Sequence, residues 1–322
     1  MIVLCHVVHH YTFIPGHDFL GNVLNVGVFS FLAISGYLYG SKTITDYKKW
    51  FLQRCMTVTL PALLVSVCVI SINACIGNKL DFCSVVLYLF NLQGLGFLHY
   101  KFYHVFTEVL VLGPLWFITV IMLCYCLVPL FQKLRCMMGT RNKNHLVLPV
   151  AFLLSCAIQW ITGIQMVYFL TFVIGYYLAA YHGERCIRIP NFVVLTAVAI
   201  AAQILRLVLR AICDGTEFYQ NYTLFSHMVL GIWIFLCCMA CGNYWPKVMD
   251  RIAHSRIILA LNDYSFYIFL THYCFCRGKL NFYELTDNLL IATLGFAAAT
   301  VLASIILKRI TNYMQKVIKE FC

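Results

Sequence analysis

Long apolar runs separated by short polar connections follow one another along the whole chain. An α-helix needs about 20 apolar residues to cross about 30 Å of hydrocarbon. The runs that meet this requirement, or come close to it, lie near 22–41, 56–77, 109–131, 146–162, 166–181, 190–212, 224–242, 257–276 and 289–307. The chain also opens with an apolar stretch at residues 1–14. This pattern predicts an all-α, polytopic integral membrane protein with about ten spans.

The composition agrees with a lipid environment. Hydrophobic residues make up 62% and charged residues 11% of the 322 residues, whereas soluble domains have about 45–50% apolar and about 25% charged residues. The connections are short, and no repeat or low-complexity segment interrupts the pattern. We therefore expect one membrane-embedded domain over residues 1–322, with the lipid bilayer as its surroundings. The sequence does not predict an oligomeric state.

The net charge of +11 is not spread evenly. Most of the lysines and arginines lie in alternate connections, which is the positive-inside pattern of membrane proteins. The basic groups are Lys42, Lys48, Lys49 and Arg54; Lys133, Arg135, Arg141 and Lys143; Arg185 and Arg188; Lys247, Arg251 and Arg256; and Lys308, Arg309, Lys316 and Lys319. This distribution argues against nucleic-acid binding. It predicts a protein of the cell membrane with both termini in the cytoplasm.

The apolar segment from Leu80 to Leu98 does not fit this alternation as a span. If it crossed the membrane, the basic connection at 132–145 would lie outside the cell. We therefore expect a re-entrant or outer-face segment near 80–108, with residues 78–108 on the outer side.

The 17 cysteines suggest a disulfide or metal interpretation, but their positions do not support one. Most lie within apolar runs, where cysteine behaves as a small hydrophobic residue. Cys238 and Cys241 form a single CxxC pair, and no second pair or histidine follows at the spacing typical of zinc sites. We expect packing roles and no bound metal.

Ionisable side chains at membrane depth are functional candidates, because they are costly there and usually face an internal cavity. His6, Arg206, Arg210 and His272 lie in predicted spans. Arg206 and Arg210 share one helix face with Gln203, since the three are spaced three and four apart. The two arginines either line a cavity or extend to the outer headgroups. His272 is either a catalytic residue or a hydrogen-bonded structural one.

The residues around His272 resemble a known motif. The stretch YSFYIFLTHY is similar to the S-[YF]-x-[IL]-[YF]-L-x-H segment of the acyltransferase-3 family, polytopic enzymes that O-acylate cell-surface polysaccharides. The stretch IVLCH, which ends at His6, resembles the V-V-L-x-H of the family's first helix. The further stretches NVGVFSFLAISGYLYG, FLQRCMTVTLP, PLWFITVIMLCYCLVPLF and YFLTFVIGYYLA follow in the family's order. The resemblance covers nearly the whole chain.

This resemblance implies a reaction and a set of residues. Family members transfer an acyl group, usually acetyl from cytoplasmic acetyl-CoA, to a sugar hydroxyl of a lipid-linked or exported glycan. By motif, the family's catalytic histidine falls on His6 and the histidine of its late motif on His272. An arginine of the loop between the second and third helices falls on Arg54, which would meet the phosphates of acetyl-CoA or be one more positive-inside charge.

The chemistry suits these residue types. A neutral imidazole, with a reference pKa of about 6.5, can take the proton of a sugar hydroxyl. Carboxylates are absent from the middle of every predicted span, which leaves a histidine as the base. Acyl transfer from a thioester builds negative charge on the carbonyl oxygen, which arginines stabilise in a water-poor site. We expect His272 and the face of Arg206 and Arg210 to line the same cavity as His6.

Two further features qualify this picture. Ser35 lies in ISGYL without the G-x-S-x-G pattern of a nucleophile, so we expect Ser35 and Gly36 to allow close helix packing. The family's usual arginine, ten or eleven residues before the first-helix histidine, would fall before Met1. Residues 1–14 would rise about 21 Å as a helix, less than the about 30 Å of hydrocarbon. We therefore expect a truncated first helix, so that either translation begins upstream of Met1 or this form is impaired.

Three functional classes remain open on this sequence. The first is a membrane O-acyltransferase that uses acetyl-CoA or another acyl-CoA. The second is a transporter or flippase of glycan intermediates, although the two matching halves with interrupted helices typical of transporters are missing. The third is a catalytically inactive family member that acts as a partner in glycan synthesis.

Overall fold

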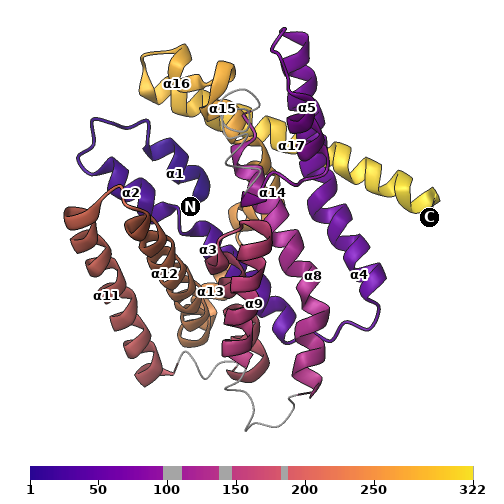
Figure 1. Cartoon of the computed structure of the whole chain (residues 1–322). Coiled ribbons are helices and arrows are strands. Elements are labelled where there is room, and N and C mark those ends of the chain that lie inside the picture. Colours follow the sequence, from indigo (N-terminus) through magenta and orange to yellow (C-terminus); the bar gives the residue numbers. More distant parts are fainter. Residues whose placement is uncertain (97–110, 138–146, 183–187, 322) are drawn as a thin grey trace. The chain divides into compact units, whose positions relative to one another are not determined.

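The structure, a computed structural model, describes residues 1–96, 111–137, 147–182 and 188–321. The described residues form helices and connections and contain no strand, which confirms the all-α prediction (Figure 1). The helices are α1 (Ile2–Val8), α2 (His17–Leu24), α3 (Gly27–Gly40), α4 (Tyr47–Arg54), α5 (Leu60–Cys75), α6 (Phe82–Leu89), α8 (Trp116–Met137), α9 (Val147–Thr162), α10 (Met166–Tyr177), α11 (Ile189–Cys213), α12 (Glu217–Tyr244), α13 (Pro246–Ala253), α14 (Arg256–Thr271), α15 (Tyr273–Cys276), α16 (Phe282–Leu285) and α17 (Leu289–Phe321). Short 3-10 turns precede α8 and α16, and π turns follow α4 and α10.

Membrane-length helices account for much of the described chain. Within the described residues, six stretches are long and apolar enough to cross a membrane by length and composition: His17–Gly40, Tyr47–Cys75, Gly113–Met137, Asn191–Cys213, Glu217–Tyr244 and Leu289–Glu320. Several of them carry exposed aliphatic side chains, for example Ile204, Leu207 and Val208 on α11, which suits contact with lipid. The protein is therefore a membrane protein, whereas the predicted count of about ten spans is not confirmed.

The shorter helices explain the difference in count. The stretches Leu148–Thr162 and Met166–Tyr181 are apolar but shorter than the other six. The predicted span at 257–276 is divided at His272 between α14 and α15, and the predicted first span contains only the 7 residues of α1. Beyond α1 the chain turns at Pro15 and Gly16, where glycine adopts a φ of +80° that other residues rarely reach.

The segment expected to be re-entrant or on the outer face begins with α6. This helix has 8 residues and therefore rises about 12 Å, too little to cross the hydrocarbon. Asp81 caps its start by accepting a hydrogen bond from the Ser84 N–H (2.9 Å). Residues 97–110, including Lys101, lie outside the described residues, as do Arg141, Lys143 and Arg185 of the basic connections, so the side of the membrane on which this segment lies stays a prediction.

The helices pack into two compact units made of interleaved stretches. Unit 1 comprises Met1, Asn22–Thr45 and Cys126–Ala253, and unit 2 comprises Ile2–Gly21, Asp46–Tyr125 and His254–Cys322. The predicted single domain over the whole chain stays a prediction.

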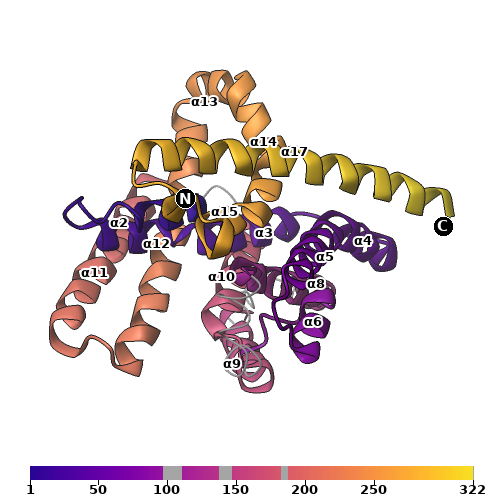
Figure 2. The same cartoon turned by 90° about the horizontal axis from the view of Figure 1, so that it is seen from above.

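Unit 1 is built around α3. This helix packs against α10 and α12, while α11 lies alongside α12 and is joined to it by a short turn (Figure 2). The approach of α3 to α10 is very close, since a Cβ atom added at Gly36 would lie 1.9 Å from the carbonyl oxygen of Phe172. Small residues allow such contacts between membrane helices. Ser35 is buried beside this contact, in agreement with the packing interpretation of the ISGYL stretch.

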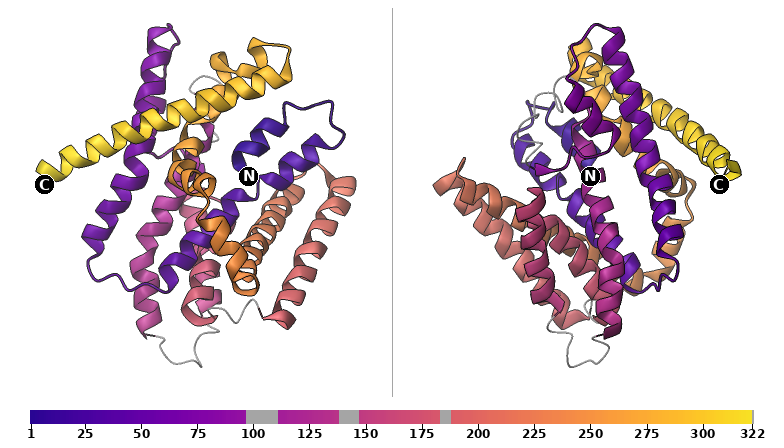
Figure 3. Two further views of the ribbon diagram at one scale, coloured as in Figure 1. Left: turned by 180° about the vertical axis from the view of Figure 1, so that it is seen from behind. Right: turned by 45° about the vertical axis from the view of Figure 1, so that its right-hand side comes forward.

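Unit 2 is built around α14, α17 and α5. Helix α17 packs against α14, α16 and α5, and Figure 3 shows it crossing α5. Five polar side chains follow one face of α17 at alternating spacings of seven and four residues, namely Thr293, Thr300, Ser304, Thr311 and Gln315. Ser304 bonds to Thr271 of α14 through the two hydroxyl oxygens (3.0 Å), so this polar face joins the helices of the unit.

Candidate active site

His6 and His272, which lie 266 positions apart in the sequence, meet in unit 2. His6 lies on α1 and His272 at the junction of α14 and α15, and α1 packs against α15. The centres of the two imidazole rings are 5.4 Å apart, and the ring planes are tilted by 32°. The ring of Tyr273 meets His6 edge-on, with a centroid distance of 5.1 Å. The two histidines singled out by sequence are therefore neighbours.

The two nitrogens of His272 have different environments. Nδ1 lies 2.7 Å from the carbonyl oxygen of Phe269 and 3.2 Å from that of Ile268. Because carbonyl oxygens only accept hydrogen bonds, Nδ1 carries the proton in the neutral ring, and Nε2 is an acceptor. The side chain is 0% exposed, and Nε2 has no hydrogen-bond partner among the described residues. A buried polar atom without a partner is uncommon in proteins and calls for an explanation.

His6 is available for proton transfer. Its side chain is half-buried, and its ring makes no hydrogen bond to a described residue. A neutral imidazole always has one nitrogen with a free lone pair, which accepts a proton. His6 thus has the chemical features of a general base beside a second histidine with a fixed orientation.

The residues that follow α1 contact α15, α16 and α17 of unit 2. The ring of His10 stacks on that of Tyr283 (4.1 Å between centroids, 4° between planes), and its Nε2 lies 3.2 Å from the carbonyl oxygen of Cys276. The Tyr11 hydroxyl lies 2.7 Å from Oγ1 of Thr293 on α17. These contacts connect residues 10 and 11 to α15, α16 and α17, and so they fix the position of α1.

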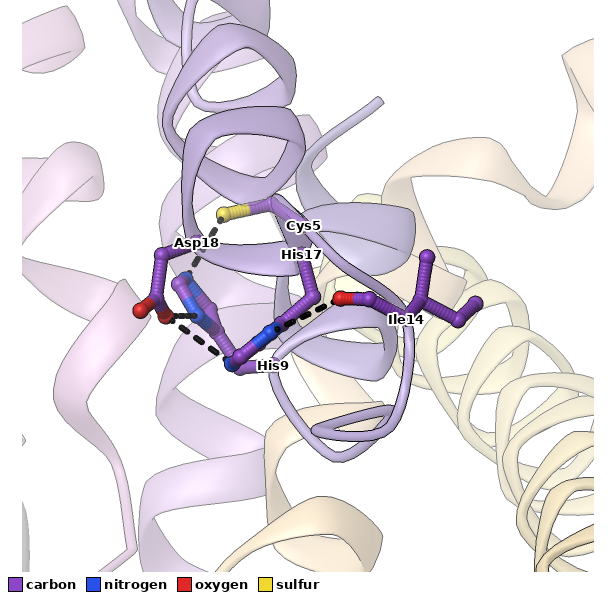
Figure 4. A network of polar contacts seen from close by, with 5 residues as sticks. All are labelled: Cys5, His9, Ile14, His17 and Asp18. Carbon is purple, nitrogen blue, oxygen red and sulfur yellow. Dashed lines mark hydrogen bonds and ion pairs between the residues drawn. The ribbon is translucent and has the colours of Figure 1, made fainter.

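A second group of polar contacts holds α1 and α2 together (Figure 4). The Asp18 carboxylate lies between two histidines, 3.5 Å from Nδ1 of His9 and 3.3 Å from Nε2 of His17. Cys5 Sγ lies 3.9 Å from Nε2 of His9, and Nδ1 of His17 contacts the carbonyl oxygen of Ile14 (3.2 Å). Within the described ranges, no group of three or more His, Cys, Asp or Glu side chains is arranged to hold a metal ion. We interpret this network as structural support for α1.

Arg54, the residue expected to contact acetyl-CoA, lies at the end of α4 in the same unit. The helix begins at Asp46, whose carboxylate accepts a hydrogen bond from the Lys49 N–H (2.9 Å). Arg54 is half-buried and directly precedes the π turn Cys55–Thr59. Its role towards the phosphates of acetyl-CoA stays a prediction.

The two arginines of α11 belong to unit 1 and differ from each other. Arg206 is buried, and its Nη1 lies 3.0 Å from Nε2 of His227 on α12. Arg210 is exposed and forms an ion pair with Asp214 (4.0 Å). The environment of Arg206 favours an internal role and that of Arg210 an interfacial one. The shared cavity with His6 stays a prediction.

His227 is a buried ionisable residue that the sequence analysis missed. It is 3% exposed and lies within the predicted span 224–242. Because guanidinium nitrogens only donate hydrogen bonds, Nε2 of His227 accepts the bond from Arg206. The signal was present, since the rule that selected His6 and His272, an ionisable side chain inside an apolar run, also selects His227.

Comparison with known proteins adds the family. No curated protein and no solved structure matches the chain. The sequence family described as "Acyltransferase domain" (Acyl_transf_3) matches residues 1–309. The matched stretch includes both histidines, Arg54 and the two arginines of α11. This confirms the resemblance inferred from the motifs, and the chain belongs to the acyltransferase-3 family.

Proposed function

We propose that this protein is an O-acyltransferase of the cell membrane that moves an acyl group, usually acetyl, from cytoplasmic acyl-CoA to a sugar hydroxyl of a lipid-linked or exported surface polysaccharide. The observation that carries the proposal is the pair of His6 and His272. One ring has no hydrogen bond to a described residue, and the other has a fixed Nδ1 proton and a buried acceptor nitrogen. The family supplies the reaction class.

The proposed reaction uses His6 as general base. His6 takes the proton of the sugar hydroxyl while the oxygen attacks the carbonyl carbon of the thioester, which forms the new C–O bond. The tetrahedral intermediate then collapses and the C–S bond breaks. The thiolate of CoA leaves and receives the proton from the His6 imidazolium, so the base is regenerated.

His272 serves as the second histidine of the proposed site. Its ring is held by the carbonyl oxygens of Phe269 and Ile268, so Nε2 remains an acceptor in a fixed direction. In this position Nε2 accepts a hydrogen bond from the substrate or from the protonated His6 ring. Preorganised groups of this kind need no rearrangement during the reaction.

The proposal also includes the contact of Arg54 with acyl-CoA and the orientation of the protein in the membrane. Arg54 binds phosphate groups of acyl-CoA at the cytoplasmic end of α4, because a guanidinium forms paired hydrogen bonds with phosphate oxygens. The distribution of basic residues supports a cytoplasmic position for Arg54 and for both termini.

A strain comparison tests the function. Mass spectrometry of surface glycans from cells with and without the gene should show an added acyl group only with the gene, and its mass names the group. His6→Ala should lower acylation at least about 100-fold, the low end of the usual contribution of a general base. His254→Ala, which changes an exposed histidine of the same unit, is the matched control and should retain activity.

Two results would count against this proposal. Identical glycans in both strains would argue against the transferase. Wild-type acylation by His6→Ala, at an equal amount of protein in the membrane, would remove His6 from the mechanism.

A further inference from the structure

The helix that contains Arg54 is followed by an irregular turn in which one backbone carbonyl lacks a backbone N–H donor. Residues Cys55–Thr59 form a π turn between α4 and α5, in which the N–H of Leu60 donates to the carbonyl oxygen of Cys55. In a π turn each carbonyl accepts from the residue five positions later. The carbonyl of Met56 would therefore need an N–H from residue 61. That residue is Pro61, which has none.

A side chain from α17 supplies the missing donor. Nε2 of Gln315 lies 2.7 Å from the carbonyl oxygen of Met56. Gln315 is part-buried on the polar face of α17, one helical turn beyond the buried Thr311, and α17 packs against α5. A primary amide donates two hydrogen bonds, so Gln315 satisfies the carbonyl that the π turn and the proline together leave open.

This turn determines the direction of Arg54. One residue of an α-helix corresponds to a rotation of about 100°, so the extra residue of a π turn rotates the side chains before it by about that angle relative to those after it. Arg54 comes directly before the turn, and the buried face of α5 begins directly after it at Pro61 and Ala62. If the turn relaxed to regular α-helix, Arg54 would point in a different direction.

We propose that Gln315 is a positioning residue for the acyl donor, because its bond to Met56 maintains the π turn and so directs Arg54 towards the phosphates of acyl-CoA. This inference rests on the proposed donor role of Arg54. Gln315 lies beyond residues 1–309, which the family matches, so family membership by itself says nothing about it. The motif around Arg54 predicts that this residue contacts acyl-CoA, and Gln315 on α17 would hold it in the direction that the contact needs.

The test measures binding of two ligands to the purified full-length protein in detergent. Acetyl-CoA carries the phosphates, whereas S-acetyl-pantetheine is the same thioester arm without them. Gln315→Leu removes the amide and should weaken acetyl-CoA binding about tenfold, which corresponds to about 1.4 kcal/mol. The affinity for S-acetyl-pantetheine should not change. Asn312→Leu, which removes an exposed amide from the same helix, is the matched control.

A double variant separates this inference from the proposed donor role. If Gln315 acts through Arg54, the combination of Arg54→Gln and Gln315→Leu should bind acetyl-CoA no more weakly than Arg54→Gln alone. Should Gln315→Leu fail to accumulate in the membrane, Gln315→Asn keeps the amide but shortens the side chain by one methylene. This variant should also bind acetyl-CoA more weakly than the wild type while its affinity for S-acetyl-pantetheine stays unchanged.

The outcomes are distinct. Unchanged acetyl-CoA binding by both Gln315 variants, with weakened binding by Arg54→Gln, overturns the positioning role and leaves the donor contact intact. Equal loss for both ligands overturns it in favour of general structural damage, and additive losses in the double variant overturn it in favour of an independent effect. Unchanged binding by Arg54→Gln contradicts the donor contact itself, and the role of Gln315 is then overturned with it.

Discussion

Replacing Gly36 by alanine would place a methyl group inside the backbone of the neighbouring helix. The new Cβ atom would lie 1.9 Å from the carbonyl oxygen of Phe172 and 2.9 Å from the nitrogen of Tyr176, both on α10. Ordinary contact begins near 3.4 Å, so α3 and α10 would have to separate by about 1.5 Å at this point. Neither obstacle is a flexible side chain that can rotate away. The variant must therefore displace a helix.

The expected loss of stability follows from this displacement. A gap of 0.5–1 Å already removes about a quarter to a half of the dispersion energy between two surfaces. Membrane helices lack a strong hydrophobic force to restore the contact, because lipid tails are as apolar as the side chains. We therefore expect Gly36→Ala to destabilise the protein by about 3 kcal/mol, the upper end of the usual range for overpacking.

Thermal stability in detergent provides the assay. The monodisperse fraction after heating should fall at a lower temperature for Gly36→Ala than for the wild type. Gly242→Ala is the matched control, since Gly242 lies within α12 and an added Cβ would meet nothing within 4 Å. This control should be as stable as the wild type or more so, because alanine is favoured over glycine in helices by about 1 kcal/mol. An unchanged transition for Gly36→Ala would refute the close contact between α3 and α10.

Two further predictions concern the candidate catalytic residues. His272→Asn keeps a donor near the position of Nδ1 but removes Nε2, so we expect stable protein with acylation lowered about 100-fold; near-normal acylation would establish a purely structural histidine. Arg206→Lys keeps the charge but loses the planar guanidinium that contacts His227, so we expect lower acylation in the glycan assay, and unchanged activity would assign the contact with His227 a purely structural role.

The fold class could be predicted from local patterns. An unpaired backbone polar group is too costly in hydrocarbon, so a segment in contact with lipid must bond its own backbone as a helix. An apolar run of membrane length therefore indicates a helix whatever its neighbours are. In the part of the chain that the structure describes, six such stretches are long enough to cross a membrane. The count was less predictable, because hydropathy does not indicate where a helix breaks. The chain turns at Gly16 after α1, and α14 ends before His272, although both stretches read as single apolar runs.

The candidate site was predictable only in part. Motifs identified His6 and His272, and the same hydropathy rule would have identified His227. Sequence alone left the role of His272 open between structural and catalytic. The structure gives its two nitrogens different environments, with Nδ1 on two carbonyl oxygens and Nε2 buried without a partner among the described residues.

Long-range contacts were beyond the reach of the sequence. The distance between His6 and His272, the bond between Arg206 and His227, and the donation from Gln315 to Met56 all join residues on different helices. Composition and periodicity determine which residues avoid lipid, because that preference belongs to each side chain. Which buried groups meet depends on how the helices pack, since a hydrogen bond requires its donor and acceptor within about 3 Å. Only the tertiary structure fixes such distances.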